Sequence, residues 1–214
     1  MTTRESSGES RLDLQAAIER LHQGERGAVL VRGTASFQDR PATSLLFPGA
    51  FNPLHDGHHQ IAKLAEEVYG TPVDFELSVQ NVDKASLDFA SIERRLSQFE
   101  NCRNVWITRT ATFVQKVELF GGVRFVVGVD TILRIAEVSY YRDEVSRRDR
   151  ALETIADAGA QFLVFGRTTS DGFQTLSHLD LPGPLRMICC EVSEEVFRHD
   201  ISSSDIRNAN SPGD

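Results

Sequence analysis

The sequence has few cysteines, no long apolar stretch and no excess of positive charge. Its three cysteines, Cys102, Cys189 and Cys190, are an odd number, and two of them are adjacent in an apolar run. This arrangement predicts reduced, buried thiols and argues against a disulfide framework or a metal cluster. No window approaches the roughly 18 apolar residues that a membrane span needs, and residues 1–10 lack the apolar core of a signal peptide. We therefore expect a cytoplasmic protein with no membrane partner.

The charge balance argues against nucleic acid as a partner. The chain carries 23 Lys and Arg residues against 31 Asp and Glu residues, which gives a net charge of -8. Bulk electrostatics cannot then hold a polyanion, although local positive charge can still bind a small anionic ligand. The 214 residues suffice for one well-packed α/β domain with a small appendage and are too few for two full domains.

From Ser44 onward, apolar runs that suit strands alternate with segments of helical periodicity. This alternation predicts an α/β fold in which helices flank a parallel sheet. Uniformly apolar runs such as residues 124–128 suit strands covered on both faces. Residues 166–184 are rich in Gly, Thr, Ser and Asp and predict a long loop, a feature that is often functional in compact domains. The expected strands are 44–48, 74–79, 104–108, 123–128, 161–165 and 186–190, and the expected helices are 57–69, 88–101, 111–120, 130–138, 143–158 and 203–209.

The same patterns divide the chain into three parts. Residues 1–43 are expected to form a short N-terminal extension, with a helix over residues 10–21 and a strand over residues 28–31. Residues 44–209 are expected to form the main domain, and the polar residues 210–214 a tail.

Residues 49–58, which we call the histidine turn, connect the first strand of the main domain to the following helix. Ligands bind at such turns in α/β sheets, because the free N–H groups of a helix N-terminus attract phosphate. Gly49 permits close approach of a phosphate, and Gly57 leaves room for a nucleotide between the imidazoles of His55 and His58. Three residues apart on a helix, these imidazoles point the same way and can donate hydrogen bonds to phosphate oxygens. A lone histidine here would more often be a surface or capping residue, but the whole string favours phosphate binding.

Residues 201–207 contain a second pattern typical of anion binding. The hydroxyls of three consecutive serines can cap a helix whose free amides bind anions, and Arg207 supplies a charged fork for phosphate. Taken alone, the segment is more typical of an ordinary capped helix. Its occurrence together with the histidine turn favours an enzyme that binds phosphates.

Both segments resemble the motifs of a known superfamily. The histidine turn resembles the G-[ST]-F-[ND]-P-x-H-x-G-H signature of the nucleotidyltransferases, and residues 201–207 resemble their I-S-S-T-x-I-R segment. The resemblance covers residues 44–209 and implies a Rossmann-like nucleotidyltransferase domain. Asn52-Pro53 is most similar to the nicotinamide and nicotinate mononucleotide adenylyltransferases, whereas Ala50 replaces the usual Ser or Thr.

The resemblance also implies roles for individual residues. Asp130, implied to contact the nucleotide, can also cap the next helix, and both roles can hold together. Lys84, implied to contact the acceptor, can instead be a solvated surface charge, and the two interpretations stay open. The implied catalytic residues are His55, His58 and Arg207. The implied nucleotide-binding residues are Gly49, Ala50, Phe51, Gly57, Gly128, Asp130, Arg167, Ser202, Ser203 and Ser204. The implied acceptor-substrate residues are Asn52, Lys84, Arg95 and Thr108.

The reaction implied is transfer of AMP from ATP to the phosphate of a nicotinamide or nicotinate mononucleotide, with release of pyrophosphate. We expect Mg²⁺ to arrive with ATP, because the sequence has no clear acidic cluster for a protein-held metal. Tyr140-Tyr141 stands where relatives specific for the nicotinamide ring carry a Trp. The alternatives are a cytidylyltransferase acting on an alcohol phosphate and a non-catalytic nucleotide-binding protein. A class I aminoacyl-tRNA synthetase fits less well, since the chain is short, acidic and without a K-M-S-K-S-like loop. A homo-oligomer stays open.

Overall fold

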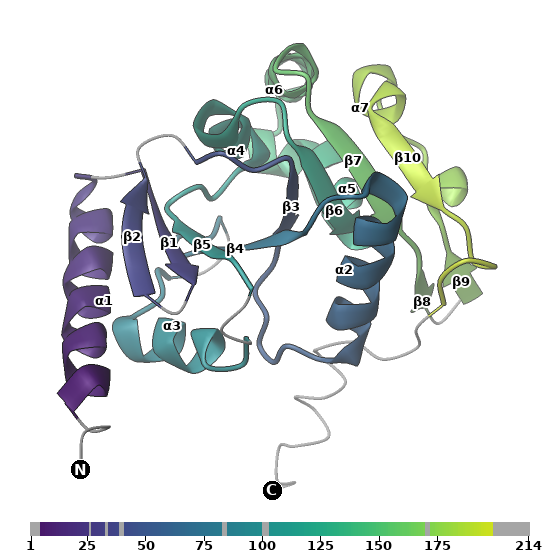
Figure 1. Ribbon diagram of the computed structural model, residues 1–214. Helices are drawn as coiled ribbons and strands as arrows, with labels where there is room; N and C mark the ends of the chain where they lie inside the picture. Colours follow the sequence, from purple (N-terminus) through teal and green to yellow (C-terminus); the bar gives the residue numbers. More distant parts are fainter. Residues whose placement is uncertain are drawn as a thin grey trace, which may run out of the picture.

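The protein is an α/β structure built on one large mixed sheet (Figure 1). The computed structural model describes residues 5–25, 27–32, 34–38, 41–82, 85–99, 103–169 and 172–198. The eight strands lie in the order β10-β7-β6-β3-β4-β5-β1-β2. Their bounds are β1 Ala28–Arg32, β2 Thr34–Gln38, β3 Leu45–Pro48, β4 Asp74–Ser78, β5 Val105–Thr108, β6 Arg124–Gly128, β7 Gln161–Phe165 and β10 Cys189–Val192.

All neighbouring strands from β10 to β5 run parallel, which confirms the Rossmann-like α/β prediction. Five of the six strands expected in the main domain form within a residue of their predicted bounds. The sixth, expected at 186–190, begins only at Cys189, because Gly183–Met187 forms the short helix α7 with Pro184 in its first turn. The main helices are α1 Glu5–Gln23, α2 Asp56–Tyr69, α3 Phe89–Leu96, α4 Phe113–Phe120, α5 Val129–Ala136 and α6 Val145–Asp157.

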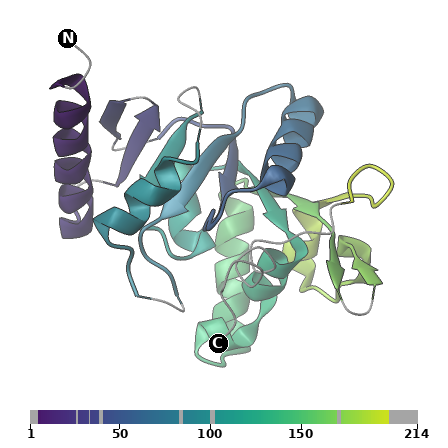
Figure 2. The ribbon, with the colours of Figure 1, turned by 90° about the horizontal axis from the view of Figure 1, so that it is seen from below.

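Helices cover both faces of the sheet (Figure 2). On one face, α4, α5 and α6 pack on a core that includes Trp106, Phe125 and Phe162. On the other face, α2 packs on Phe75 and Phe165, while α1 and α3 pack on a third cluster beside it. The alternation of side chains along the strands explains the two faces, since Phe125 and Val127 point to one core and Val126 to the other.

The N-terminal extension completes one end of the sheet. It contributes α1 and two strands, where the sequence pattern predicted only one. Strand β1 pairs antiparallel with β5, with Ala28 opposite Thr108, and Ile18 and Leu21 of α1 are buried against Leu77 and its neighbours. The extension is therefore packed as part of the same core and is not a separate appendage.

Residues 166–184 are more ordered than the long loop that their composition predicts. They form the hairpin β8 Arg167–Thr169 and β9 Gly172–Gln174, followed by the 3-10 helix η2 Leu176–His178. A second 3-10 helix, η1 Val138–Tyr141, follows α5. The hairpin starts directly after β7, so it extends from the edge where the parallel strands end.

The thiol prediction is corrected in part. Cys189 and Cys190 are free, as expected, but Cys190 is exposed and Cys189 is half-buried. Both lie on β10, which is an edge strand of the sheet, and successive side chains of a strand face opposite ways. Cys102 lies outside the described residues.

Candidate active site

The candidate site lies where the chain changes direction across the sheet. Strand β3 is central, with β4 on one side and β6 on the other, and the later strands continue outward in both directions. In open α/β sheets, ligands bind at this switch point, beyond the carboxyl ends of the strands. The register pairs Leu46 with Phe125, so Gly49 after β3 and Gly128 at the end of β6 lie level with each other.

The start of the histidine turn is fixed by aromatic packing. The Gly49 N–H donates to the Glu76 carbonyl at 3.0 Å, and Phe51 then takes a positive φ of 45°. The ring of Phe51 is buried and meets Phe75 edge to face at 5.4 Å. A Cβ at Gly49 would lie 2.6 Å from that ring, so the glycine is required by Phe51. Close approach of a phosphate at Gly49 stays a prediction.

His55 and His58 lie side by side at the start of α2. His55 is the N-cap residue of the helix, and the two imidazole centroids are 3.9 Å apart. His58 Nδ1 accepts a hydrogen bond of 3.2 Å from the His55 backbone N–H. A neutral His58 ring therefore carries its proton on Nε2, the nitrogen that can donate to a ligand. Gly57, between them, is buried.

Helix α3 holds the histidine turn from the side. Arg95 Nη1 donates to the Ala50 carbonyl at 3.2 Å. The Gln98 amide makes two hydrogen bonds with the turn: Nε2 donates to the Phe51 carbonyl at 3.0 Å, and Oε1 accepts from the Leu54 N–H at 2.9 Å. Arg95, expected at the acceptor, thus contacts the turn itself. Gln98 was not predicted, since its partners are far away in the sequence and a single polar residue on a helix gives no pattern.

Two predicted nucleotide-binding residues meet beside the turn. Asp130, in the first turn of α5, forms an ion pair with Arg167 at the start of β8. Both side chains are about half exposed. The alternative role of Asp130 as N-cap is wrong, because Gly128 occupies the N-cap position of α5.

A buried polar cluster underlies the next strand ends. It consists of Glu76, Thr108, Thr110 and Lys116, whose residues are 0–8% exposed. Lys116 Nζ donates to both Glu76 carboxylate oxygens, at 2.8 and 2.7 Å, and to the Thr110 carbonyl at 2.9 Å. The Thr108 hydroxyl donates to Glu76 and is fully buried. Thr108, expected beside the acceptor, is therefore bonded to Glu76 within the buried cluster at the end of β5.

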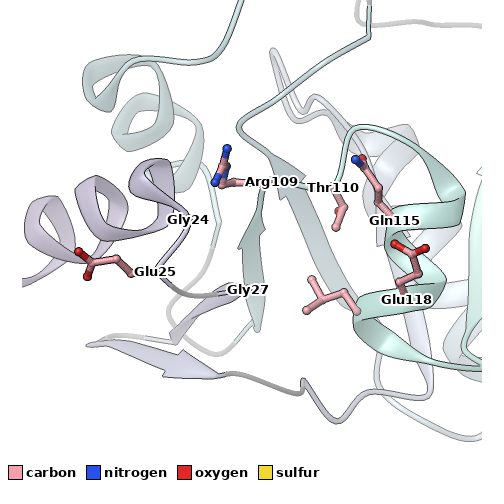
Figure 3. A pocket seen from close by; sticks show the side chains of 8 residues that line it. Gly24, Glu25, Gly27, Arg109, Thr110, Gln115 and Glu118 are labelled. Carbon is pink, nitrogen blue, oxygen red and sulfur yellow. The ribbon is translucent and has the colours of Figure 1, made fainter.

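An open hollow of about 430 Å³ lies above this cluster (Figure 3). Its walls come from the chain between α1 and β1, including Glu25, and from α4, including Gln115. Arg109 lies between the two walls, with its guanidinium next to the side-chain amide of Gln80. Gly24 has a φ of 80°, a backbone conformation that favours glycine, and it lies next to the Arg109 guanidinium. No sequence pattern indicated this hollow.

Several predicted residues cannot be placed. Lys84, Ser202, Ser203, Ser204 and Arg207 lie outside the described residues, as does the helix expected at 203–209. Asn52 lies in the histidine turn and is half-buried. Within the described part of the chain, no group of three or more His, Cys, Asp or Glu residues is arranged to hold a metal ion. Over the same residues, no helix is long and apolar enough to span a membrane.

The fold and the position of the histidine turn are those of a Rossmann-like nucleotide-binding domain. A model of the cytidylyltransferase-like family matches residues 46–209, so the chain belongs to this family. The family is part of the nucleotidyltransferase superfamily, which includes the mononucleotide adenylyltransferases. No curated protein matches the chain.

Proposed function

We propose that the protein is an adenylyltransferase that transfers AMP from ATP to the phosphate of a nicotinamide or nicotinate mononucleotide. The observation that carries this proposal is the pair of adjacent imidazoles at the N-terminus of α2, at the switch point of the sheet. Membership of the family supports nucleotidyl transfer in general. The choice of ATP and of the acceptor rests on the resemblance of Asn52-Pro53 to the mononucleotide adenylyltransferases.

In the proposed reaction, an acceptor phosphate oxygen attacks the α-phosphorus of ATP. The new P–O bond forms as the bond from the α-phosphorus to the bridging oxygen breaks, and pyrophosphate leaves in line. His55 and His58 donate hydrogen bonds to triphosphate oxygens and stabilise the charge that develops on the leaving group. Arg207 and the serines before it are proposed to bind the triphosphate as well. Mg²⁺ delivered with ATP would neutralise phosphate charge, with its remaining ligands from water.

The acceptor is proposed to extend from the histidine turn toward the hollow. Strands β3 and β5 are two strand spacings apart, about 10 Å, a span that a mononucleotide can bridge. The hollow has the size of a small-molecule site, which usually measures about 300–1,000 Å³. Lys84 is proposed to bind the acceptor phosphate and Asn52 to contact the acceptor. Asp130 and Arg167 are proposed to contact the nucleotide.

A cytidylyltransferase acting on an alcohol phosphate is the second candidate, because the matching family model is described as cytidylyltransferase-like. Such an enzyme would use the same histidine turn and differ in its nucleotide and acceptor. Pyrophosphate release should therefore be measured with ATP and with CTP. Each is combined with nicotinamide mononucleotide, nicotinate mononucleotide and glycerol 3-phosphate. Release with ATP and a pyridine mononucleotide supports the proposal, and release only with CTP and glycerol 3-phosphate supports the second candidate.

His58→Ala and His59→Ala form a matched pair for this assay. His59 is next in the sequence but exposed, and we assign it no contact with the nucleotide. Loss of turnover in His58→Ala alone would support the proposed role of the turn. ATP binding without pyrophosphate release in the wild-type protein would instead identify a non-catalytic nucleotide-binding protein.

A further inference from the structure

The backbone of the histidine turn has few partners within regular structure. It connects β3 to α2 through residues 49–55, and Phe51 lies in the left-handed region. Backbone polar groups in such a segment need partners elsewhere, because a half-buried amide or carbonyl without one is costly. Two of these groups, the Phe51 carbonyl and the Leu54 N–H, are bound by one side chain, Gln98.

We infer that Gln98 is a positioning residue that fixes the backbone of residues 51–54 and, through it, the direction of the two imidazoles toward the triphosphate. This inference rests on the proposed function, since it assigns Gln98 an effect on triphosphate binding and turnover. Gln98 does not contact the reacting atoms in this assignment. It acts through His55, whose backbone directly follows Leu54.

The chemistry of a primary amide explains why glutamine suits this position. Gln98 must donate to a carbonyl and accept from an N–H at the same time, at 3.0 and 2.9 Å. Of the side chains of this length, an amide alone offers both a donor and an acceptor in fixed geometry. A carboxylate has no proton for the Phe51 carbonyl, and a thioether replaces neither bond.

The position of Gln98 just beyond the end of α3 limits the freedom of its amide. Gln98 directly follows the C-cap residue, Ser97, and its Nε2 also donates to the Arg95 carbonyl at 3.3 Å. The preceding turn of the helix packs through Ile92, which is fully buried. The amide is thus bonded to the end of α3, which packs on the sheet, and to the backbone of the histidine turn.

The test compares Gln98→Met and Gln98→Glu with Ser97→Ala. Methionine keeps the length of the side chain and removes both hydrogen bonds, whereas glutamate keeps only the bond from Leu54. Ser97 is exposed, and its hydroxyl donates only to Arg94 of its own helix, so it serves as the matched control. Steady-state pyrophosphate release gives kcat and the KM values for ATP and for the acceptor, and thermal unfolding gives the folded fraction.

We expect kcat/KM for ATP to fall by about 10- to 100-fold in both Gln98 variants, because a small misplacement of catalytic groups costs rates of this order. The KM for ATP should rise, and the KM for the acceptor should rise as well, because Asn52 lies in the same segment. A merely structural role would lower the folded fraction and scale kcat, but leave both KM values as they are. That pattern, or wild-type kinetics in a folded Gln98→Met protein, would overturn the inference.

The dissociation constant for ATP separates this inference from the proposed function. If the wild-type protein binds ATP but releases no pyrophosphate, the proposed reaction fails, yet Gln98 can still be tested by calorimetric titration. Weaker ATP binding in Gln98→Met than in Ser97→Ala would support the positioning role. Equal ATP binding in the two variants would refute it. If Gln98→Met does not fold, Gln98→Glu, which has the same shape as glutamine, carries the comparison.

Discussion

At the residue scale, the surroundings of His58 determine which of its ring nitrogens can donate a hydrogen bond. His58 Nδ1 accepts from the backbone of His55, so its Nε2 is the nitrogen that can donate to a phosphate. The hydrogen bond thus sets the tautomer of the neutral ring as well as its orientation. This geometry could not be predicted from the spacing of the two histidines alone, which indicated only a shared direction.

Substitution of His58 by the two amides tests this tautomer. Both variants replace the imidazole of His58 by an amide. Asparagine places its amide near the position of Nδ1, and glutamine places it near the position of Nε2. We expect His58→Asn to lose about 100-fold or more in kcat, the usual cost of one lost donor to a developing negative charge, and His58→Gln to lose less. Pyrophosphate release measures both. The reverse order of activities would contradict the assigned donor nitrogen.

The two adjacent cysteines should differ in reactivity. Burial, and then the neighbouring Cys190, raises the pKa of the Cys189 thiol to about 12. Since the thiolate is the reactive form, Cys189 should stay unmodified by iodoacetamide at pH 8 while the exposed Cys190 reacts. Mass spectrometry of the peptide, with Cys190→Ser as the control, measures the difference. Equal labelling of the two thiols would show that the edge strand β10 opens readily.

At the scale of elements, the buried polar cluster joins β4, the end of β5 and α4. Lys116 of the ion pair holds the connection from β5 to α4 through the carbonyl of Thr110, a residue that lines the hollow. Removing one partner of a buried pair leaves a buried charge, so Lys116→Met should destabilise the fold by about 3–5 kcal/mol. Chemical denaturation should show a smaller loss in the double variant Glu76→Leu/Lys116→Met. Equal losses in the single and double variants would contradict this account.

The N-terminus of α3 makes a pH-dependent contribution. The hydrogen bonds from Ser91 hold the pKa of Asp88 below its ordinary value of 3.8, and Ser91 N–H donates to Asp88 Oδ1 at 2.8 Å. Because the folded pKa is the lower one, this stabilisation is complete above pH 3.8 and is lost as the pH falls through the folded pKa. Asp88→Asn should keep the cap and remove this dependence, as thermal unfolding between pH 2 and 7 can measure. An unchanged acid dependence in Asp88→Asn would argue against the cap as its source.

At the scale of the whole molecule, the N-terminal extension belongs to the core. Deletion of residues 1–43 would remove β1 from the edge of β5 and expose Leu77 and Ile107, which α1 helps to cover. Exposed strand edges and apolar surface favour aggregation. We expect the remaining chain to unfold at a lower temperature and to aggregate in size-exclusion chromatography. A stable monomer as resistant to heat as the full chain would show that the main domain folds alone.

The sequence was sufficient to predict the parallel strands, but not the hairpin or the strand pairing at the end of the sheet. Apolar runs such as residues 124–128 mark buried strands because both faces need apolar side chains. The hairpin of β8 and β9 was missed, since its strands are short and polar. The antiparallel docking of β1 on β5 was also missed, because strand order depends on packing between distant segments.

The candidate site follows the same division. The histidine turn was predicted because Pro48-Gly49 interrupts the apolar run before a helical pattern, and because its residues resemble a known signature. The contacts of Gln98 with Phe51 and of Arg95 with Ala50 join residues more than forty positions apart, and no local pattern records them.

The direction of β1 has a consequence for how this protein could change its substrate. Because β1 runs opposite to β5, the segment before it lies at the same sheet edge as the histidine turn and forms a wall of the hollow. Residues 24–27 lie outside the segment matched by the family model, which begins at residue 46. Under the proposed function, substitutions of Gly24, Glu25 or Gly27 would reshape one side of the hollow without changing the histidine turn. Selection among acceptors could then diverge separately from nucleotidyl transfer.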